Sequence, residues 1–193
     1  MARGMTEDDQ VDPTRRYAAL DVRARAGRAW PEAAVRVAFA VIWAIDASLK
    51  WQPGFRATIV PNLAATAAGA PHWLGPWFDL WLRLERADPS AWAYLAAGTE
   101  TMLAVCVLLG VARKLVYAGG AAYALMVWST ADGFGAPYGP GATDIGPAIM
   151  YSVVFCALLA MGAQGAAGRY NLDALITRRV AWWHRLGWGS EGN

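Results

Sequence analysis

Four long apolar stretches divide the chain, and more polar segments separate them. They cover residues 33–51, 90–112, 115–131 and 145–164. A helix needs about 17–25 residues to cross a bilayer, so each stretch is long enough to span one. We therefore predict an all-α integral membrane protein. Its four-helix bundle would occupy residues 31–168, between an N-terminal arm (1–30) and a C-terminal tail (169–193).

The segment between the first two stretches is too long and too patterned for a simple loop. Residues 61–70 are apolar but too short to span, and residues 72–84 are amphipathic. The helical period predicts an apolar face and a charged face, formed respectively by Trp73, Trp77, Leu80 and Leu84 and by Asp79, Arg83 and Arg86. We expect an interfacial helix or a re-entrant pair over the mouth of the bundle. It would be either a lid over a pocket or an amphipathic connector.

Proline positions indicate where helices begin, because proline is favoured in the first turn of a helix. Pro13 and Pro31 each predict a helix start in or after the arm. Thr143 and Asp144 stand just before Pro147, so we expect them to cap the fourth spanning helix.

Composition and charge agree with a membrane protein. Hydrophobic residues make up 56% of the chain and charged residues 17%, with 11 Trp, whereas soluble domains are about 25% charged. Cys106 and Cys156 lie in apolar stretches without CxxC spacing, which argues against a disulfide framework or a zinc site. A net charge of +2 does not point to nucleic acid as a partner.

The basic residues predict the orientation in the membrane. Six Arg precede residue 31, Arg113-Lys114 lie between the second and third stretches, and four more Arg follow the fourth. The positive-inside rule places both termini in the cytoplasm, with the protein in the plasma (inner) membrane and the other two loops outside. The bilayer is thus the first predicted partner. The arginines of the arm would meet anionic lipid or an acidic partner surface, or belong to a solvated arm.

Three charged side chains stand out in the first two spans. Asp46 and Lys50 are four residues apart and share a helix face, and Trp51 follows them. Glu100 lies ten residues past the predicted start of the second span, which is about 15 Å of helix. An acid at that depth must face protein or water. The simpler interpretations are an ion pair that anchors a helix end and a buried, hydrogen-bonded structural glutamate.

The same outer end also receives residues from the loops and the fourth span. With Asp46, Lys50 and Glu100, we expect them to ring one outward-facing cavity; they are His72, Asp132, Asp144 and Tyr151. Burial and like charge should keep at least one carboxyl protonated near neutral pH, which suits proton delivery to a quinone. Taken singly, Asp144 fits a helix cap and Asp132 an Asp-Gly turn.

The pattern resembles the DoxX/DoxD family of small four-span membrane proteins, over about residues 33–165. The matching features are Ser-Leu-Lys50-Trp, Gly98-Thr-Glu100, the Arg113-Lys114 turn and Asp144-Ile-Gly. The inserted outer segment is more similar to the DoxD branch, the membrane subunit of thiosulfate:quinone oxidoreductase. The N-terminal arm and the Trp-rich tail depart from the family pattern.

The resemblance implies a membrane subunit of a quinone-linked oxidoreductase that acts on a reduced sulfur compound. Glu100 and Asp46 are the candidate catalytic residues, as proton relays. The candidate substrate- or quinone-binding residues are Lys50, Trp51, Asp144 and Tyr151. The resemblance implies quinone as the cofactor. No haem, metal or phosphate-loop motif occurs in the chain, so a partner subunit would supply the redox centre. The alternative is a non-catalytic accessory subunit that binds lipid and a neighbouring subunit, so the sequence leaves open whether the chain is an enzyme.

Overall fold

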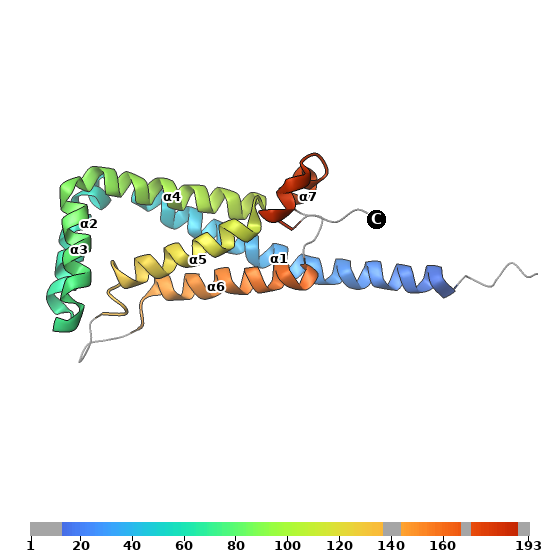
Figure 1. Cartoon of the computed structure of the whole chain (residues 1–193), viewed down its shortest axis with the longest axis horizontal. Helices are drawn as coiled ribbons and strands as arrows, with labels where there is room; N and C mark the ends of the chain where they lie inside the picture. The colour runs from blue at the N-terminus through green and yellow to red at the C-terminus, as the bar shows by residue number, and fades with distance from the viewer. Residues whose placement is uncertain (1–12, 137–143, 167–170, 189–193) are drawn as a thin grey trace, which may run out of the picture.

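The computed structural model describes residues 13–136, 144–166 and 171–188, and these residues form helices and turns with no strand (Figure 1). The predicted all-α class is confirmed. The α-helices are α1 Pro13–Lys50, α2 Pro53–Gly69, α3 Gly75–Ala87, α4 Pro89–Leu109, α5 Arg113–Ser129, α6 Pro147–Met161 and α7 Leu172–Thr177. Predictions for residues 1–12, for Thr143 and its neighbours, and for residues 167–170 and 189–193 lie outside the described residues.

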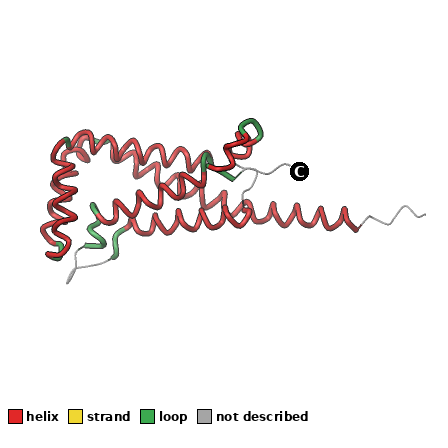
Figure 2. The backbone as a smooth tube through the Cα atoms, in the orientation of Figure 1, coloured by secondary structure: helices red, strands yellow, loops and turns green. Residues whose placement is uncertain are grey.

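Four long helices, α1, α4, α5 and α6, lie side by side, and the α2–α3 hairpin lies across one end of them (Figure 1). Short turns join most of the helices (Figure 2). α1 packs mainly against α4, and α5 against α6. Aromatic rings fill the centre: Phe39 and Trp43 of α1 lie 4.9 and 5.2 Å from the ring of Phe155 on α6. The core of the bundle therefore contains aromatic rings that pack edge to face and come from helices far apart in the sequence.

Two of the described helical segments, Pro89–Leu109 and Pro147–Gln164, are long and apolar enough to cross a membrane. The predicted first and third spans do form helices, but α1 carries charges and α5 has 17 residues. All four helices nevertheless expose large apolar side chains, among them Ile42, Ile45, Leu95, Met102, Leu115, Leu125, Met150 and Val153. The four-span arrangement is taken up below as part of a proposal.

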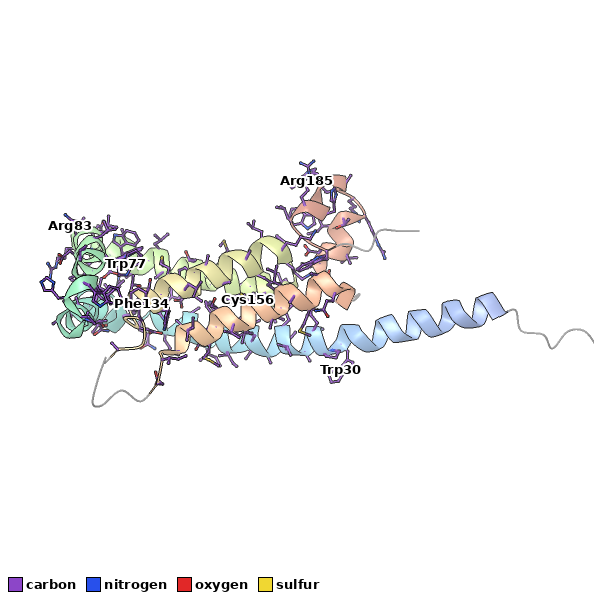
Figure 3. All side chains as sticks on the ribbon, turned by 60° about the horizontal axis from the view of Figure 1, so that its bottom comes forward. Trp30, Trp77, Arg83, Phe134, Cys156 and Arg185 are labelled. Carbon is purple, nitrogen blue, oxygen red and sulfur yellow. The ribbon has the colours of Figure 1, made fainter. Side chains whose placement is uncertain are left out.

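α1 is one helix from Pro13 to Lys50, so the helix start predicted at Pro31 is wrong. Proline inside a helix removes one backbone hydrogen bond and usually favours a break. Here the turn that follows is held against the bundle. The Tyr117 hydroxyl donates to Glu32 Oε1 at 3.1 Å, and Arg36 Nη1 donates to the Val107 carbonyl at 2.7 Å. Before this turn α1 extends beyond the bundle (Figure 1), with the Trp30 ring pointing away from it (Figure 3).

The α2–α3 hairpin confirms that residues 54–89 form a helical structure over the bundle end, but a different face of α3 is buried. Leu74, Phe78 and Leu82 pack against Leu63 of α2. Trp73, which belongs to the predicted apolar face, is 76% exposed. The reason is the spacing: residues 74, 78 and 82 form an uninterrupted i, i+4 stripe, and this stripe is what meets α2.

Two tryptophans fasten the hairpin to the bundle. The Trp77 indole N–H donates to the Ser129 carbonyl at the end of α5 (2.9 Å), and the Trp92 indole N–H of α4 donates to the Leu84 carbonyl (2.7 Å). The Trp77 ring also lies 6.4 Å from that of Phe134, and Figure 3 shows these two residues together at the hairpin end. The hairpin is thereby held in one position over the bundle.

The described part of the C-terminal tail folds back onto the turn between α4 and α5. Asp173 of α7 accepts hydrogen bonds from the Ala112 and Arg113 backbone N–H groups at 2.7 and 3.1 Å. The Trp183 indole N–H donates to the same carboxylate at 2.8 Å, and Arg113 Nη2 donates to the Trp188 carbonyl at 2.8 Å. These side chains attach the described part of the tail to the bundle of its own chain.

Candidate functional site

The predicted polar cluster exists at the end of the bundle where α1 leads into the hairpin. Lys50 Nζ lies 3.0 Å from Asp46 Oδ2 and 3.4 Å from Glu100 Oε2. The Tyr123 hydroxyl donates to Glu100 Oε1 at 3.1 Å. We call these four residues the Lys50 cluster. It joins α1, α4 and α5, so residues from three separate helices meet at one point.

Burial differs within the Lys50 cluster. Glu100 is 3% exposed, whereas the side chains of Lys50 and Asp46 are 22% and 35% exposed. A buried carboxylate is stable only when it is paired or hydrogen-bonded, and here Lys50 and Tyr123 serve that purpose. Glu100 Oε2 makes the ionic contact but has no hydrogen-bond partner. This oxygen therefore retains the capacity to bind a further group.

A cavity of about 280 Å³ lies between the hairpin and the bundle, with Lys50 and Glu100 on its wall. Its apolar lining comes from α2, α3, α4 and α5 and includes Phe55, Ile59, Leu63, Trp81, Trp92, Leu95, Met126 and Val127. Its polar lining consists of Lys50, Asn62, Glu85, Thr99, Glu100, Tyr123 and Thr130. The cavity is thus apolar and aromatic on most sides, with a few polar groups on its wall. We call it the hairpin cavity.

A second cavity of about 130 Å³ adjoins the Lys50 cluster. Lys50, Glu100 and Tyr123 line both cavities. The smaller one is also lined by Asp46, Asp132 and the α6 residue Tyr151. The Lys50 cluster therefore borders two cavities, and the smaller one carries two further carboxyl groups.

Of the two loop acids predicted to line the site, Asp132 lines the smaller cavity and Asp144 lines neither cavity. Asp132 Oδ2 accepts the hydrogen bond of the Ala148 N–H at 2.9 Å in the first turn of α6, and it lines the smaller cavity. Burial raises the pKa of the Asp132 carboxyl, although this hydrogen bond works in the opposite direction. Asp144 Oδ1 accepts from the Gly146 N–H at 2.7 Å, before the helix begins. Asp132, not Asp144, is therefore the residue that caps α6.

The structure brings four of the six predicted site residues to the cavities, namely Asp46, Lys50, Glu100 and Tyr151. Asp144 and Trp51 line neither. The Trp51 indole N–H donates to Thr101 Oγ1 at 3.0 Å, and the side chain is on the outside of the bundle, with Trp51 51% exposed. His72, at the start of the hairpin's second arm, is exposed as well.

Two residues that line the hairpin cavity, Tyr123 and Glu85, were not predicted from the sequence. Tyr123 carried no signal beyond its place in an apolar helix. Glu85 did carry a sequence signal: it lies three residues after Leu82, next to the buried face of α3. Its Oε2 atom is buried without a hydrogen-bond partner, and burial raises the pKa of Glu85 to about 7. The apolar face of α3 therefore ends in a carboxyl group on the hairpin cavity.

In chemical terms the site offers an ammonium, a buried carboxyl and a phenol beside an aromatic-walled chamber. Among the described residues there is no group of three or more His, Cys, Asp and Glu side chains placed to hold a metal ion. Searches for similar proteins found no family model, no curated protein and no solved structure that matches this chain. The chemistry of the site therefore rests on the geometry of the chain itself.

Proposed function

We propose that this protein is a DoxD-like, four-span membrane subunit that binds a quinone in the hairpin cavity and takes part in its reduction by electrons from a reduced sulfur compound. One observation carries the proposal: the Lys50 cluster borders an aromatic-walled cavity of about 280 Å³. Small-molecule sites are typically apolar chambers of about 300–1,000 Å³ with a few convergent polar groups, and this cavity is close to that range.

The membrane setting follows from the outer surface of the bundle. α4 and α6 meet the requirements for spanning, and exposed apolar side chains on α1 and α5 suit contact with lipid. With the Arg113-Lys114 turn on the cytoplasmic side, the Lys50 cluster and the hairpin lie at the outer face of the plasma (inner) membrane, and both termini lie in the cytoplasm. The hairpin then acts as a lid at the level of the lipid headgroups.

The residues present fit a quinone headgroup. The rings of Trp81 and Trp92, 6.0 Å apart, offer flat apolar surfaces for it. Lys50 Nζ can donate a hydrogen bond to a ring oxygen, since an ammonium group has three donors and its known partners here are two carboxylates. Glu100 stands beside it as the group that holds or releases a proton. When bound, the quinone would accept two electrons and two protons.

Proton supply would come through the smaller cavity. Asp46, Asp132 and Glu100 all line it, so protons from the outer loops would reach Glu100 without crossing the hairpin cavity. Tyr123, hydrogen-bonded to Glu100, would hold that carboxyl in place. Electrons would come from a partner subunit that supplies the redox centre.

A second candidate is a non-catalytic accessory subunit, and the shape of α1 favours it. α1 continues past the bundle toward the N-terminus, and Trp30 is 64% exposed (Figure 3). A helix that extends from the bundle and carries an exposed indole is suited to contact with a neighbouring subunit.

Quinone binding tests the first proposal directly. A short-chain oxidised quinone is titrated into the detergent-purified protein, and binding is followed by quenching of tryptophan fluorescence. Ala96→Leu, which fills the hairpin cavity, should weaken binding at least tenfold. Ala91→Leu, at an exposed position of the same helix, is the matched control and should bind like wild type. Absence of saturable binding to wild type, or equal affinity in the two variants, would contradict the proposal.

Turnover separates the two candidates. The protein is purified in mild detergent with its copurifying chains and assayed for quinone reduction with thiosulfate or sulfide. Loss of activity in Glu100→Gln and Asp46→Asn, with the complex still assembled, supports the oxidoreductase subunit. Full activity of the assembled complex in both variants supports the accessory role.

A further inference from the structure

Glu85 is a second carboxyl group on the hairpin cavity, and the proton chemistry proposed above does not use it. It follows Leu84, whose carbonyl accepts the Trp92 indole N–H at 2.7 Å, and it lies one turn from Trp81 on the same face of α3. The Trp81 and Trp92 rings are 6.0 Å apart. Glu85 and Trp92 therefore line the same part of the cavity.

The Lys50 cluster stands at a different part of the same cavity. Trp92 and Glu100 both line it and are eight residues apart on α4, a separation of about 12 Å along the helix axis. The cavity thus has ionisable side chains at two separated places, and apolar side chains of α2, α4 and α5 also line it. A ligand that satisfies both needs an oxygen or nitrogen at each end of an apolar body.

Glu85 Oε2 has no hydrogen-bond partner among the residues that the structure describes. This atom is buried, and buried polar atoms in folded proteins nearly always have such a partner. The other ionisable side chains on the cavity are Lys50 from α1, Glu100 from α4 and Tyr123 from α5, and α2 lines it with no ionisable side chain. Lys50 is engaged by Asp46 and Glu100, so the apolar setting acts on Glu85 without an opposing cation. Its pKa is accordingly raised to about 7 by burial.

We propose that Glu85 is a ligand-binding residue whose protonated carboxyl donates a hydrogen bond to a carbonyl oxygen at the Trp92 end of the hairpin cavity. This inference rests on the proposed function and deepens it. The ring of an oxidised quinone carries an oxygen at each end, one for Lys50 and one for Glu85. Ionised Glu85 has no proton to donate and would repel the electron-rich oxygen, so binding of the oxidised form should weaken as Glu85 loses its proton.

The experiment compares binding at two pH values in the full-length, detergent-purified protein. A short-chain oxidised quinone is titrated at pH 6 and at pH 8.5. Wild type should bind about three- to tenfold more weakly at pH 8.5, the range expected for loss of one neutral hydrogen bond. Glu85→Gln keeps an N–H donor at both pH values and should lose most of this difference. Glu85→Leu removes the donor and should bind weakly at both.

Asp79→Asn is the matched control, because Asp79 is an exposed acid on the opposite face of α3. It should keep the wild-type pH dependence. A second readout is the infrared carbonyl band of a protonated carboxyl group. Quinone binding at pH 7 should shift this band in wild type and in Asp79→Asn, and the shift should be absent in Glu85→Gln.

The outcomes separate this inference from the proposed function. If wild type binds the quinone and Glu85→Gln keeps the full pH dependence, or Glu85→Leu binds like wild type, Glu85 is not a ligand contact while the quinone site stands. If wild type shows no saturable binding at either pH, both are overturned. Because Gln is close to Glu in shape, Glu85→Gln should unfold at the wild-type temperature at pH 6, which guards against loss of the fold as a cause.

Discussion

Two buried charge clusters occupy opposite ends of the bundle, and they are built differently. One joins Glu32, Arg113 and Asp173 at the turn between α4 and α5, beside α7 (Figure 1). The other is the Lys50 cluster beneath the hairpin. The first cluster has side chains 0–3% exposed, whereas Lys50 and Asp46 are partly exposed and border cavities.

In the Arg113 cluster, formed by Glu32, Arg113 and Asp173, the Asp173 carboxylate is fully hydrogen-bonded, whereas Arg113 Nη1 has no hydrogen-bond partner. The Asp173 carboxylate accepts four hydrogen bonds, from the Ala112 and Arg113 backbone N–H groups, from Arg113 Nε at 3.2 Å and from the Trp183 indole. Arg113 Nη1 also lies 3.6 Å from Glu32 Oε1. Nearly every charge is met by packed protein, so the cluster ties the tail and α1 to the α4–α5 turn.

The Lys50 cluster is left incomplete. Glu100 Oε2 has only the 3.4 Å contact with Lys50 and no hydrogen bond, and both residues lie on open volume. Each cluster has one buried atom without a hydrogen bond, Arg113 Nη1 or Glu100 Oε2. The Lys50 cluster differs in that it borders cavities, and an unsatisfied polar atom beside a cavity indicates a place for a ligand. Substitutions in the first should therefore reduce stability, and substitutions in the second should reduce binding.

The largest expected effect is the loss of stability in Asp173→Ala. Removing this carboxylate leaves the fully buried Arg113 without its main partner, and breaking a buried ion pair in this way costs about 3–5 kcal/mol. Thermal or denaturant unfolding in detergent measures it. Asp79→Ala, at an exposed position, is the control and should change stability by less than about 0.5 kcal/mol. Equal stability of the two variants would contradict a structural role for Asp173.

Gly120→Ala should come second. A Cβ atom there would lie 2.4 Å from Phe155 Cζ, so α5 and α6 must separate. Overpacking of this kind costs about 1–3 kcal/mol, and it should also disturb Tyr123, one turn further along α5, and thus weaken quinone binding.

Gly119→Ala is the matched neighbour, since a Cβ atom there meets nothing within 4 Å. It should be neutral or stabilising, by at most about 1 kcal/mol, the helix preference of Ala over Gly. Similar unfolding temperatures for the two variants would show that the α5–α6 contact is looser than described.

Lys50→Met should reduce quinone binding more than stability, whereas Asp173→Ala should mainly reduce stability. Quinone affinity is expected to fall at least tenfold, about 1.4 kcal/mol, because the donor to the ring oxygen is lost. Stability should fall less than in Asp173→Ala, since Glu100 can take up a proton beside the cavity. Fluorescence titration and thermal unfolding on the same samples check this, with Arg83→Met as an exposed control. A larger loss of stability than in Asp173→Ala would reverse the roles assigned to the two clusters.

A further effect is the pH dependence of stability through Glu85. Its pKa is about 7 in the fold against 4.5 for the free side chain, so the folded state binds more protons between these values. Stability should therefore fall as the pH rises from 4.5 through 7 and then level off. Glu85→Gln should flatten this part of the profile in thermal unfolding at pH 5 and pH 8. An unchanged slope would show that other groups, such as Asp132, account for it.

Much of the site could be predicted from local sequence signals. Asp46 and Lys50 are four residues apart on one helix, and that spacing alone is enough to pair them. Glu100 could be placed because a carboxylate deep in an apolar helix needs a partner, and Lys50 is the partner it has. Trp51 and Asp144 were misplaced, since neighbours in sequence can face opposite sides of a helix or turn.

The sequence by itself determined where the helices lie, that they are apolar on the outside, and that charged groups occur at two levels of the bundle. These follow from helical period and hydropathy, which are local properties. Only the tertiary structure decided that Glu85 faces a cavity, that Asp132 caps α6, and that Asp173 meets Arg113 across 60 residues. Those contacts depend on which faces of distant helices pack together, and no local pattern encodes that choice.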